Sequence, residues 1–364
     1  MSHSPCPPTV PYPCPSVDPS TNVNRDWNLS EVPDMCQLLC GMNPTGIVML
    51  PQLASGYGYI GDIWLSSHRP FGANIKNGFT IQAKAGVVLI KAPTASTPLG
   101  GRPGVALRVT GCANVVFMNI TFSGACLTTG AVGDEPDAQE PNASQPSSGY
   151  GLKVDVGKGP NLDVLTLSGC EACNNSVSGI LTANMNHVTA AACSAHDNLS
   201  QHGLYFSQSG DALLVSGGTF SNNGRTGIQV NAHDPQTQGG NGRDGITTGL
   251  KITGNVILEQ NQLLKLGAAL NILAVQGTVA GGMTIDSVSV KKHPGVNGFN
   301  IAPVGGNQSK NLTFSHNHFG VFLDVDPSSY CIYTIPGSNI GLSIAGNGND
   351  HIDGALTPAI TNYV

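Results

Sequence analysis

The chain has 364 residues, which is enough for one large domain or two of ordinary size. Only 10% of the residues are charged, and the net charge is −6 without any basic run, so nothing supports a nucleic-acid partner. No apolar stretch reaches about 18 residues, so the sequence predicts no membrane-spanning helix. Abundant Gly (47) and Pro (24) favour short strands joined by tight turns over amphipathic helices.

Residues 1–26 form a leader rich in Pro and Cys, which we expect to be irregular. It begins MSHSPCPPTVPYPCP, without the cationic and apolar regions of a secretion signal. Either the chain stays in the cell or it leaves by another route, such as assembly into a particle. The second route would make it an extracellular or virion-associated protein, which is the location we expect.

Residues 27–41 have the apolar spacing of a short helix, with Ser30 as its N-cap and Gly41 as its C-cap. A stack of strands exposes backbone groups at its open end, and such edges invite aggregation unless something covers them. We therefore expect this helix to cap the repeat that follows.

A tetrad of Gly or Ala, an apolar residue, a variable residue and a second apolar residue recurs along the chain. The regular spacings between tetrads are 21 to 29 residues, and the alternation within each is that of a half-buried strand. The tetrads begin at Gly78, Ala106, Gly151, Gly179, Gly203, Gly227, Ala269, Gly298, Gly320 and Gly341.

A second strand follows most tetrads, and several of these strands end in Asn shortly before the next Gly. Asn tolerates the left-handed backbone of a sharp corner, and stacked amides can hydrogen-bond to one another. We expect such stacking at Asn175, Asn198, Asn223, Asn261 and Asn317. Cys170 and Cys193 each lie five positions before their Asn, so they should also stack.

One coil cannot bury its apolar face alone, whereas coils stacked at ~4.8 Å share a continuous interior. The sequence therefore predicts an all-β fold, a single-stranded right-handed parallel β-helix of about ten coils. Leucine-rich repeats and propeller blades fit the spacing less well. The expected β-helix with its cap covers residues 27–350, and residues 351–364 form a C-terminal tail.

The cap helix, the strand TGIVMLP and the coil SNNGRTGIQV resemble the pectate-lyase-like right-handed β-helix superfamily over about residues 27–350. Bacteriophage tailspikes, polysaccharide lyases, glycoside hydrolases and epimerases belong to this superfamily. The resemblance implies the fold and a polysaccharide partner. The catalytic motifs of polygalacturonases, pectate lyases and mannuronan epimerases are absent, so no catalytic role is carried over.

The tetrad strands should direct alternate side chains outward and so form one long polar strip. Amides, hydroxyls and occasional rings in a strip suit an extended sugar polymer, although an ordinary solvated face would look the same. The substrate-binding candidates are Arg108, Gln229, Asn231, Asn271 and Asn300. Other members of the strip are Thr80, Gln82, Lys153, Asp155, Leu181, Tyr205, Phe322 and Asp324.

Two spacings between tetrads, of 45 and 42 residues, are longer than the regular ones and mark insertions. Loops of this kind usually form the walls of a groove on a rigid scaffold. The second insertion carries His233 and Asp234. A lyase or epimerase needs a base, an acid and a group that neutralises a uronate, so the catalytic candidates are Lys153, Asp155, Tyr205, His233 and Asp234. A hydrolase pair on the strip is excluded, because its two acidic residues would lie roughly 29 Å apart.

Two functions stay open from the sequence. The first is a polysaccharide-binding and polysaccharide-cleaving β-helix, for which lyase or epimerase chemistry is favoured. The second is a non-catalytic structural or adhesive β-helix of a virion or surface assembly, where a homotrimer would be expected. We expect no cofactor and no metal, because the C-x-x-C at residues 170–173 has no second half.

Overall fold

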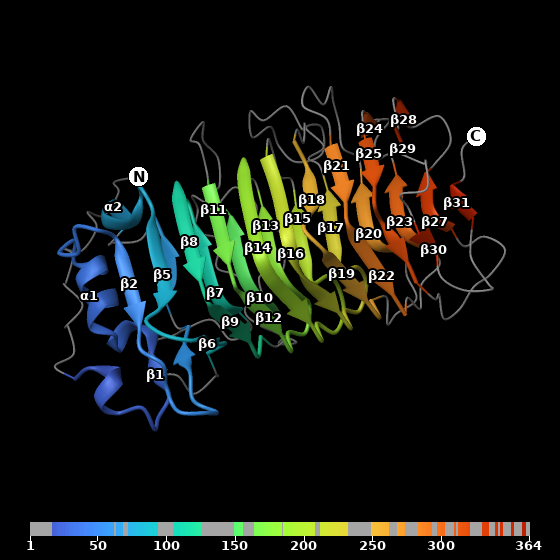
Figure 1. Ribbon diagram of the computed structural model, residues 1–364. Helices are drawn as coiled ribbons and strands as arrows, with labels where there is room; N and C mark the ends of the chain where they lie inside the picture. Colours follow the sequence, from blue (N-terminus) through green and yellow to red (C-terminus); the bar gives the residue numbers. More distant parts are fainter. Residues whose placement is uncertain are drawn as a thin grey trace, which may run out of the picture.

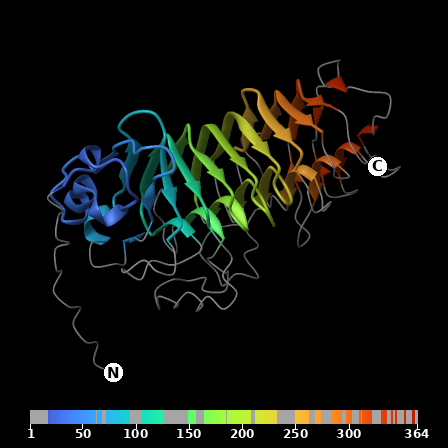
Figure 2. The same cartoon turned by 90° about the horizontal axis from the view of Figure 1, so that it is seen from below.

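The computed structural model describes most of the chain between residues 17 and 361. The described segments are 17–61, 63–67, 72–93, 105–125, 149–155, 164–183, 185–207, 212–231, 249–261, 268–273, 283–292, 297–302, 309–310, 312–320, 330–334, 339–340, 343–344, 351–352 and 359–361. Their strands stack into a long right-handed parallel β-helix (Figures 1 and 2). The expected fold class is confirmed, and one sheet of ten strands matches the expected ten coils.

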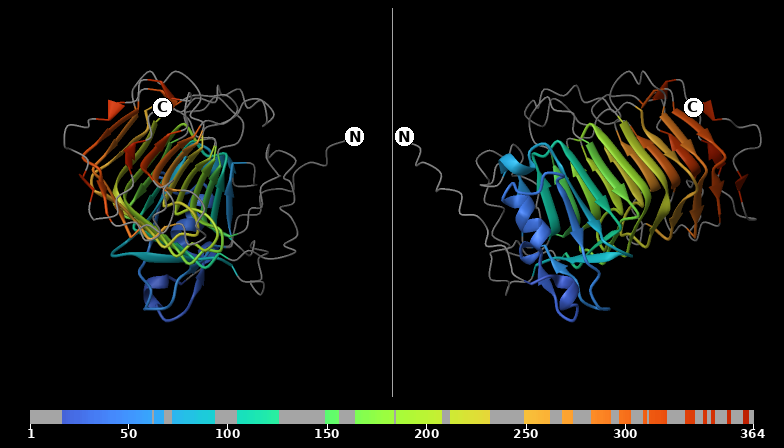
Figure 3. Two further views of the ribbon diagram at one scale, coloured as in Figure 1. Left: turned by 90° about the vertical axis from the view of Figure 1, so that its right-hand side faces the viewer. Right: turned by 60° about the vertical axis from the view of Figure 1, so that its left-hand side comes forward.

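The strands form three columns that run along the rod, and Figure 3 shows the rod from near one end. Columns one and two belong to one sheet, because β14 (His187–His196) and β16 (Ala212–Ser221) pass through both. The other strands of column one are β2 (Ile47–Leu50), β5 (Phe79–Ala83), β8 (Asn114–Met118), β11 (Val164–Ser168), β18 (Lys251–Thr253), β21 (Met283–Asp286), β25 (Leu312–Ser315) and β29 (Ser343–Ile344).

Column two begins at the cap and also reaches the far end of the rod. Its strands besides β14 and β16 are β1 (Trp27–Asn28), β3 (Tyr59–Ile60), β6 (Val88–Lys91), β9 (Ile120–Ser123), β12 (Glu171–Cys173), β19 (Val256–Glu259), β22 (Val288–Lys291), β26 (His318–Phe319) and β30 (His351–Ile352).

Column three is the sheet that carries most of the tetrads. Its strands are β4 (Trp64–Ser66), β7 (Val105–Thr110), β10 (Tyr150–Asp155), β13 (Ser178–Ala183), β15 (Leu204–Ser207), β17 (Ile228–Asn231), β20 (Ala268–Leu273), β23 (Asn297–Ala302), β27 (Tyr330–Thr334) and β31 (Ala359–Thr361). A separate pair, β24 (Ser309–Lys310) and β28 (Asn339–Ile340), lies outside the three columns.

The assignment of two tetrads to this column was wrong. The tetrad at Gly78 forms β5 in column one, so Thr80 and Gln82 lie on another face of the rod. The tetrad at Gly341 contributes β29, also in column one. Column three instead contains β4 and β27. All three columns share the same apolar alternation, so the pattern alone does not separate them. Phe322 and Asp324 lie outside the described residues.

Most of the described coils have three strands instead of the two that the sequence indicated, whereas β14 and β16 each run through columns one and two as one continuous strand. The expected second strand bends where the backbone turns left-handed, as at Asn119 with φ 56° between β8 and β9. Asn adopts this conformation at lower cost than most residues. The bend converts one expected strand into consecutive strands of columns one and two.

The interior is one continuous core that is almost entirely apolar. Leu152, Ile180, Leu204 and Ile228 follow one another in register and are fully buried. The tetrads therefore direct their second residue inward, as predicted. Burial of one such side chain contributes about 1.5–3 kcal/mol to folding, so this core is the main source of stability.

A ladder of buried amides follows the turn from column two to column three. Asn175 donates to Asn198 at 2.9 Å, Asn198 to Asn223 at 2.8 Å, and Asn223 to Asn261 at 2.8 Å. All four side chains are fully buried. This ladder confirms the predicted stacking, and we refer to these four residues as the inner ladder.

Asn317 does not belong to the inner ladder. It lies at the other corner, between β25 and β26, where its amide donates to the carbonyl of Ile285 and accepts from the backbone of Val288. The predicted stacking of Cys170 on Cys193 is confirmed, because Glu171 pairs with Ser194 in register and the backbone of Ser194 donates to the carbonyl of Cys170. Among the described residues, seven cysteines are free thiols.

The N-terminal cap is shorter than the sequence indicated. After β1, a 3-10 helix spans Leu29–Glu31, and α1 covers only Pro33–Leu39. Ser30 therefore lies in the 3-10 helix, and Val32 is the N-cap of α1. This helix packs against β2, which begins the first column, and α2 (Gly72–Ile75) contacts both α1 and β4.

The two ends of the predicted domain also differ from expectation. Within the leader, a 3-10 helix spans Pro19–Thr21, and the Asp26 carboxylate accepts hydrogen bonds from the backbone of Gly58 and from Lys91. Beyond residue 350, β30 and β31 pair with β26 and β27. The sheets thus extend into the segment that was assigned to a tail.

Candidate functional site

The predicted strip corresponds to a column of side chains on the outer side of column three. Its members pair in register from strand to strand, and we call it the outer column. It consists of Trp64, Arg108, Lys153, Leu181, Tyr205, Gln229, Asn271, Asn300 and Tyr333. The alternation of the tetrads predicted seven of these nine positions, from Arg108 to Asn300.

The cap end of the outer column is cationic and buried. Arg108 and Lys153 are neighbours on β7 and β10, and their exposed fractions are only 7% and 4%. The Arg108 guanidinium lies 4.3 Å from the ring centroid of Trp64, a cation–π contact. The Trp64 indole also donates to the Thr110 hydroxyl at 3.0 Å. This end was predicted to face solvent, and the structure shows that it does not.

An apolar cluster occupies the middle of the outer column. Leu181 packs with Tyr150 and Val177, and the ring of Tyr205 lies against them. Burial, with a contribution from Tyr205, raises the pKa of Tyr150 to about 12. The ring of His202 meets Tyr205 edge-on at 4.9 Å between centroids.

His202 is buried and hydrogen-bonded to the Thr226 hydroxyl. Burial, with a smaller repulsion from Arg225, lowers the pKa of His202 to about 3. The imidazole is therefore neutral at ordinary pH and supports the corner before β15 as an uncharged ring.

The far end of the outer column is a second amide ladder, partly open to solvent. Asn300 donates to Asn271 at 2.8 Å, and Asn271 donates to Gln229 at 2.9 Å. We call these three residues the outer ladder. Asn231, two residues after Gln229, donates to the Tyr205 hydroxyl at 3.4 Å. Unlike the cap end, Asn271 and Asn300 keep part of their surface exposed.

The structure brings only some of the catalytic candidates together. Lys153 and Tyr205 lie in the same column, but the strand that carries Leu181 separates them. Asp155 pairs with Thr110 and Ala183 in register, and its side chain is outside the described part of the structure. His233 and Asp234 also lie outside the described residues. No catalytic set is therefore assembled among the residues that the structure describes.

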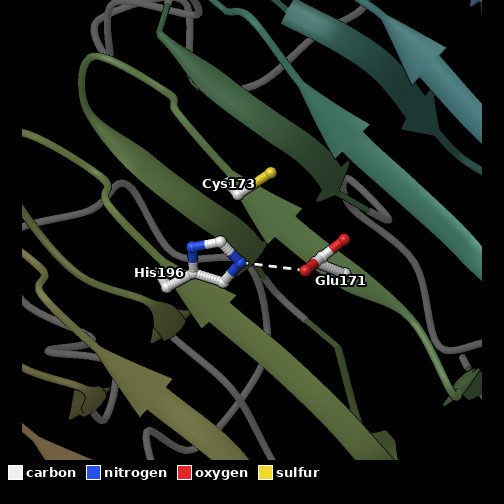
Figure 4. Close-up of side chains that lie close together, drawn as sticks. All are labelled: Glu171, Cys173 and His196. Atoms are coloured by element: carbon white, nitrogen blue, oxygen red, sulfur yellow. Dashed lines mark hydrogen bonds and ion pairs between the residues drawn. The ribbon is translucent and has the colours of Figure 1, made fainter. Parts of the chain in front are cut away.

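A separate polar cluster lies on the outer side of column two. Glu171 and Cys173 are two residues apart on β12, so they point to the same side of the sheet. His196 stands opposite Cys173 on β14. Figure 4 shows the His196 ring directed at the Glu171 carboxylate with Cys173 beside them, and the ligand-type atoms of the three residues all lie within 4.8 Å of each other.

The imidazole of His196 is held between two carboxylates. Its Nε2 lies 2.9 Å from Glu171 Oε1, and its Nδ1 lies 2.7 Å from Asp197 Oδ2. Although burial lowers the pKa of His196, its hydrogen bonds to both carboxylates outweigh that effect and raise the pKa. The second oxygen of Glu171 accepts from the Thr121 hydroxyl at 2.8 Å.

This cluster was not predicted, although the sequence contained the signal. Cys170 and Cys193 occupy equivalent places in successive coils, and three positions further on stand Cys173 and His196. Glu171 then follows from strand alternation. If the alignment of the two coils at Cys170 and Cys193 is continued for three more positions, it places the three side chains on one face.

Comparisons with known proteins add little to this geometry. No protein-family model matches the chain. No curated protein matches it. Among solved structures, the chain is similar to the catalytic domain of GH87 alpha-1,3-glucanase in complex with nigerose, with a TM-score of 0.37 and 14% identity over 87% of this chain and 58% of that chain.

The chain thus spans less than two thirds of that neighbour's length. The fold assignment rests on the strand register of this protein itself, and the pectate-lyase-like resemblance stays a prediction. In the described segments, no helix combines the length and hydropathy needed to cross a membrane.

Proposed function

We propose that this protein binds an extended glycan along the outer column, over the strands from β15 to β27. The observation that supports the proposal most strongly is the outer ladder, in which Asn271 and Asn300 are partly exposed and the buried Gln229 holds Asn271 in place. A polysaccharide presents a regular row of hydroxyls, and a row of amides at strand spacing offers matching partners.

The hydrogen bonds of the outer ladder leave groups available for a ligand. The Asn271 amide uses one N–H toward Gln229 and accepts one hydrogen bond from Asn300. An amide has two N–H groups and two carbonyl lone pairs, so half of this capacity is left for sugar hydroxyls. The ladder bonds also hold the amides in a fixed orientation, which lowers the entropic cost of binding.

Aromatic residues stand at both ends of the outer ladder. Tyr205 precedes Gln229 in the column, and Tyr333 follows Asn300. Both rings are partly exposed. Sugar ring faces pack well on aromatic rings, so each Tyr would contact one end of the bound segment.

A panel of acidic and neutral polysaccharides tests this proposal, with affinity measured for the full chain and for Asn271→Ala. Loss of one hydrogen-bonding amide should weaken binding about tenfold, since about 1.4 kcal/mol corresponds to one decade of affinity. The matched control is Asn114→Ala, an exposed Asn on column one. It should bind as the wild type does. Failure of every glycan to bind, or equal losses in the two variants, would overturn the proposal.

Cleavage of an acidic polysaccharide by a lyase or epimerase is a second candidate. Its chemistry would use the cationic pair Arg108 and Lys153 and the Tyr205 phenol of the same column, but both cations are buried, so an acidic chain would first have to displace what covers them. A cation can neutralise a uronate, and a phenol can transfer a proton. Absorbance of unsaturated products and assay of reducing ends would reveal lyase or hydrolase turnover. Binding without any product would support an adhesive β-helix instead.

For an adhesive role, we also propose where the protein acts and how it assembles. A rod that binds polysaccharide would act outside the cell or on a virion, and homotrimers would present three outer columns together. Light scattering of the purified chain measures this directly: a mass of three chains supports the trimer, and a mass of one chain contradicts it.

A further inference from the structure

The cluster on column two has the composition and arrangement of a metal site. Glu171, Cys173 and His196 offer one oxygen, one sulfur and one nitrogen ligand, all within 4.8 Å of one another. In a tetrahedral zinc site with bonds of about 2.0–2.3 Å, ligand atoms stand roughly 3.3–3.8 Å apart. Small side-chain rotations would bring these three atoms to that spacing.

Neighbouring groups already orient each of the three side chains. Asp197 lies on the Nδ1 side of the His196 ring, which leaves Nε2 directed at the Glu171 carboxylate. Thr121 donates to the other Glu171 oxygen. Cys173 Sγ lies 3.7 Å from the Ser123 hydroxyl. Histidines that bind metals usually donate their other N–H to a carboxylate in this way.

The backbone also fixes the positions of the three ligands. Glu171 and Cys173 share a short strand, and the adjoining strand places His196 in register with Cys173. Ala172 and Ala195, the inward neighbours on the same strands, are fully buried in the core. The three ligand side chains therefore project from a rigid sheet and not from a loop.

We propose that Glu171, Cys173 and His196 bind one zinc ion, with Asp197 as a residue that positions His196. A thiolate and an imidazole favour zinc over calcium or magnesium, which prefer oxygen ligands. To bind the ion, Cys173 must be a thiolate and His196 must offer the lone pair of an unprotonated Nε2. The protons that these two groups lose pass to solvent. The ion joins successive coils, and its fourth position stays open to water or a ligand.

Metal binding to the full chain tests the proposal, after chelation and dialysis under reducing conditions. Zinc is titrated by calorimetry, and cobalt is used as a probe because a cobalt–thiolate bond has a charge-transfer absorption in the near ultraviolet. Cys173→Ser should lower the stoichiometry by one ion per chain and reduce that absorption by the contribution of this site. Cys40→Ser, a thiol in the cap, is the matched control and should behave as the wild type does.

Comparison between variants is necessary because Cys6, Cys14 and Cys126 lie outside the described residues and can also bind metals. Should Cys173→Ser fail to fold, Asp197→Asn keeps the proposal testable, with an expected loss of about 10- to 100-fold in zinc affinity. Equal stoichiometry in wild type and Cys173→Ser, or no cobalt–thiolate absorption in the wild type, would overturn it. The site is independent of the proposed glycan surface, so removal of zinc should leave glycan affinity unchanged.

Discussion

Two ladders of amide side chains run along this rod, and they differ in burial. The inner ladder, Asn175 to Asn261, is fully buried at the turn before column three, and its amides also bind backbone groups. The outer ladder, Gln229 to Asn300, lies on the outer side of column three, where Gln229 is buried but Asn271 and Asn300 are partly exposed. Inside, the amides satisfy backbone groups that water cannot reach. Outside, the same groups have spare capacity for a ligand.

The largest expected effect is the loss of stability when an Asn of the inner ladder is replaced by Ala. The same substitution in the outer ladder should cost less. Asn198 makes four hydrogen bonds, to the backbone and side chain of Asn175, to Ala172 and to Asn223. Asn198→Ala leaves several of these buried partners unsatisfied, at about 1–3 kcal/mol each, so we expect a loss of at least about 3 kcal/mol. Urea unfolding measures it.

Asn271→Ala is the matched control in the outer ladder. Its neighbour Asn300 is partly exposed and only Gln229 is buried, so a single buried group loses its partner and the cost in stability should be about 1–2 kcal/mol, less than that of Asn198→Ala. Equal losses of unfolding free energy in the two variants would show that burial does not distinguish the ladders.

A smaller effect should follow from the buried imidazole of His202. Its folded pKa of about 3 lies below the ordinary 6.5, so between these values the unfolded chain binds a proton that the native state does not. The contribution of His202 to stability is therefore complete above about pH 6.5 and is lost as the pH falls toward 3. At about pH 4.5 the loss should be about 2–3 kcal/mol.

Urea unfolding at several pH values, in wild type and His202→Gln, isolates this contribution from that of the carboxylates. The difference in unfolding free energy between the two proteins should shrink as the pH falls through this window. A difference that stays constant from pH 7 to 4 would mean that His202 is not held neutral by burial.

The smallest expected effect is a gain. Thr182 is fully buried in the interior, and among the described residues its hydroxyl has no hydrogen-bond partner. Valine has nearly the same shape and no hydroxyl, so Thr182→Val should stabilise the protein by about 1 kcal/mol. An upward shift of the thermal midpoint would support this, whereas a decrease would indicate that the hydroxyl is satisfied in solution.

The sequence predicted the coil, the inward residues and much of the outer column, because a half-buried strand alternates with a period of two. It could not separate the columns: the tetrad at Gly78 alternates as the tetrad at Gly203 does, and only pairing with β2 and β8 places it in column one. Trp64 and Tyr333 were missed because no tetrad introduces their strands.

The local sequence pattern also did not predict which of the outward side chains are buried. Arg108 and Lys153 occupy outward positions as expected, yet both are buried, and Arg108 packs against the ring of Trp64, 44 positions earlier in the chain. The cluster of Glu171, Cys173 and His196 required comparison of two coils position by position. A site whose residues come from neighbouring strands is found from the strand register and not from any single sequence motif.

The most direct measurement of the glycan proposal is the affinity of oligosaccharides of increasing length, taken from whichever polymer binds. Tyr205 and Tyr333 lie four strand steps apart, roughly 19 Å. Affinity should rise with length until the ligand spans that distance and then level off, and Asn271→Ala should flatten the rise. Affinity that is independent of length, or a length series unchanged by Asn271→Ala, would contradict an extended glycan on the outer column.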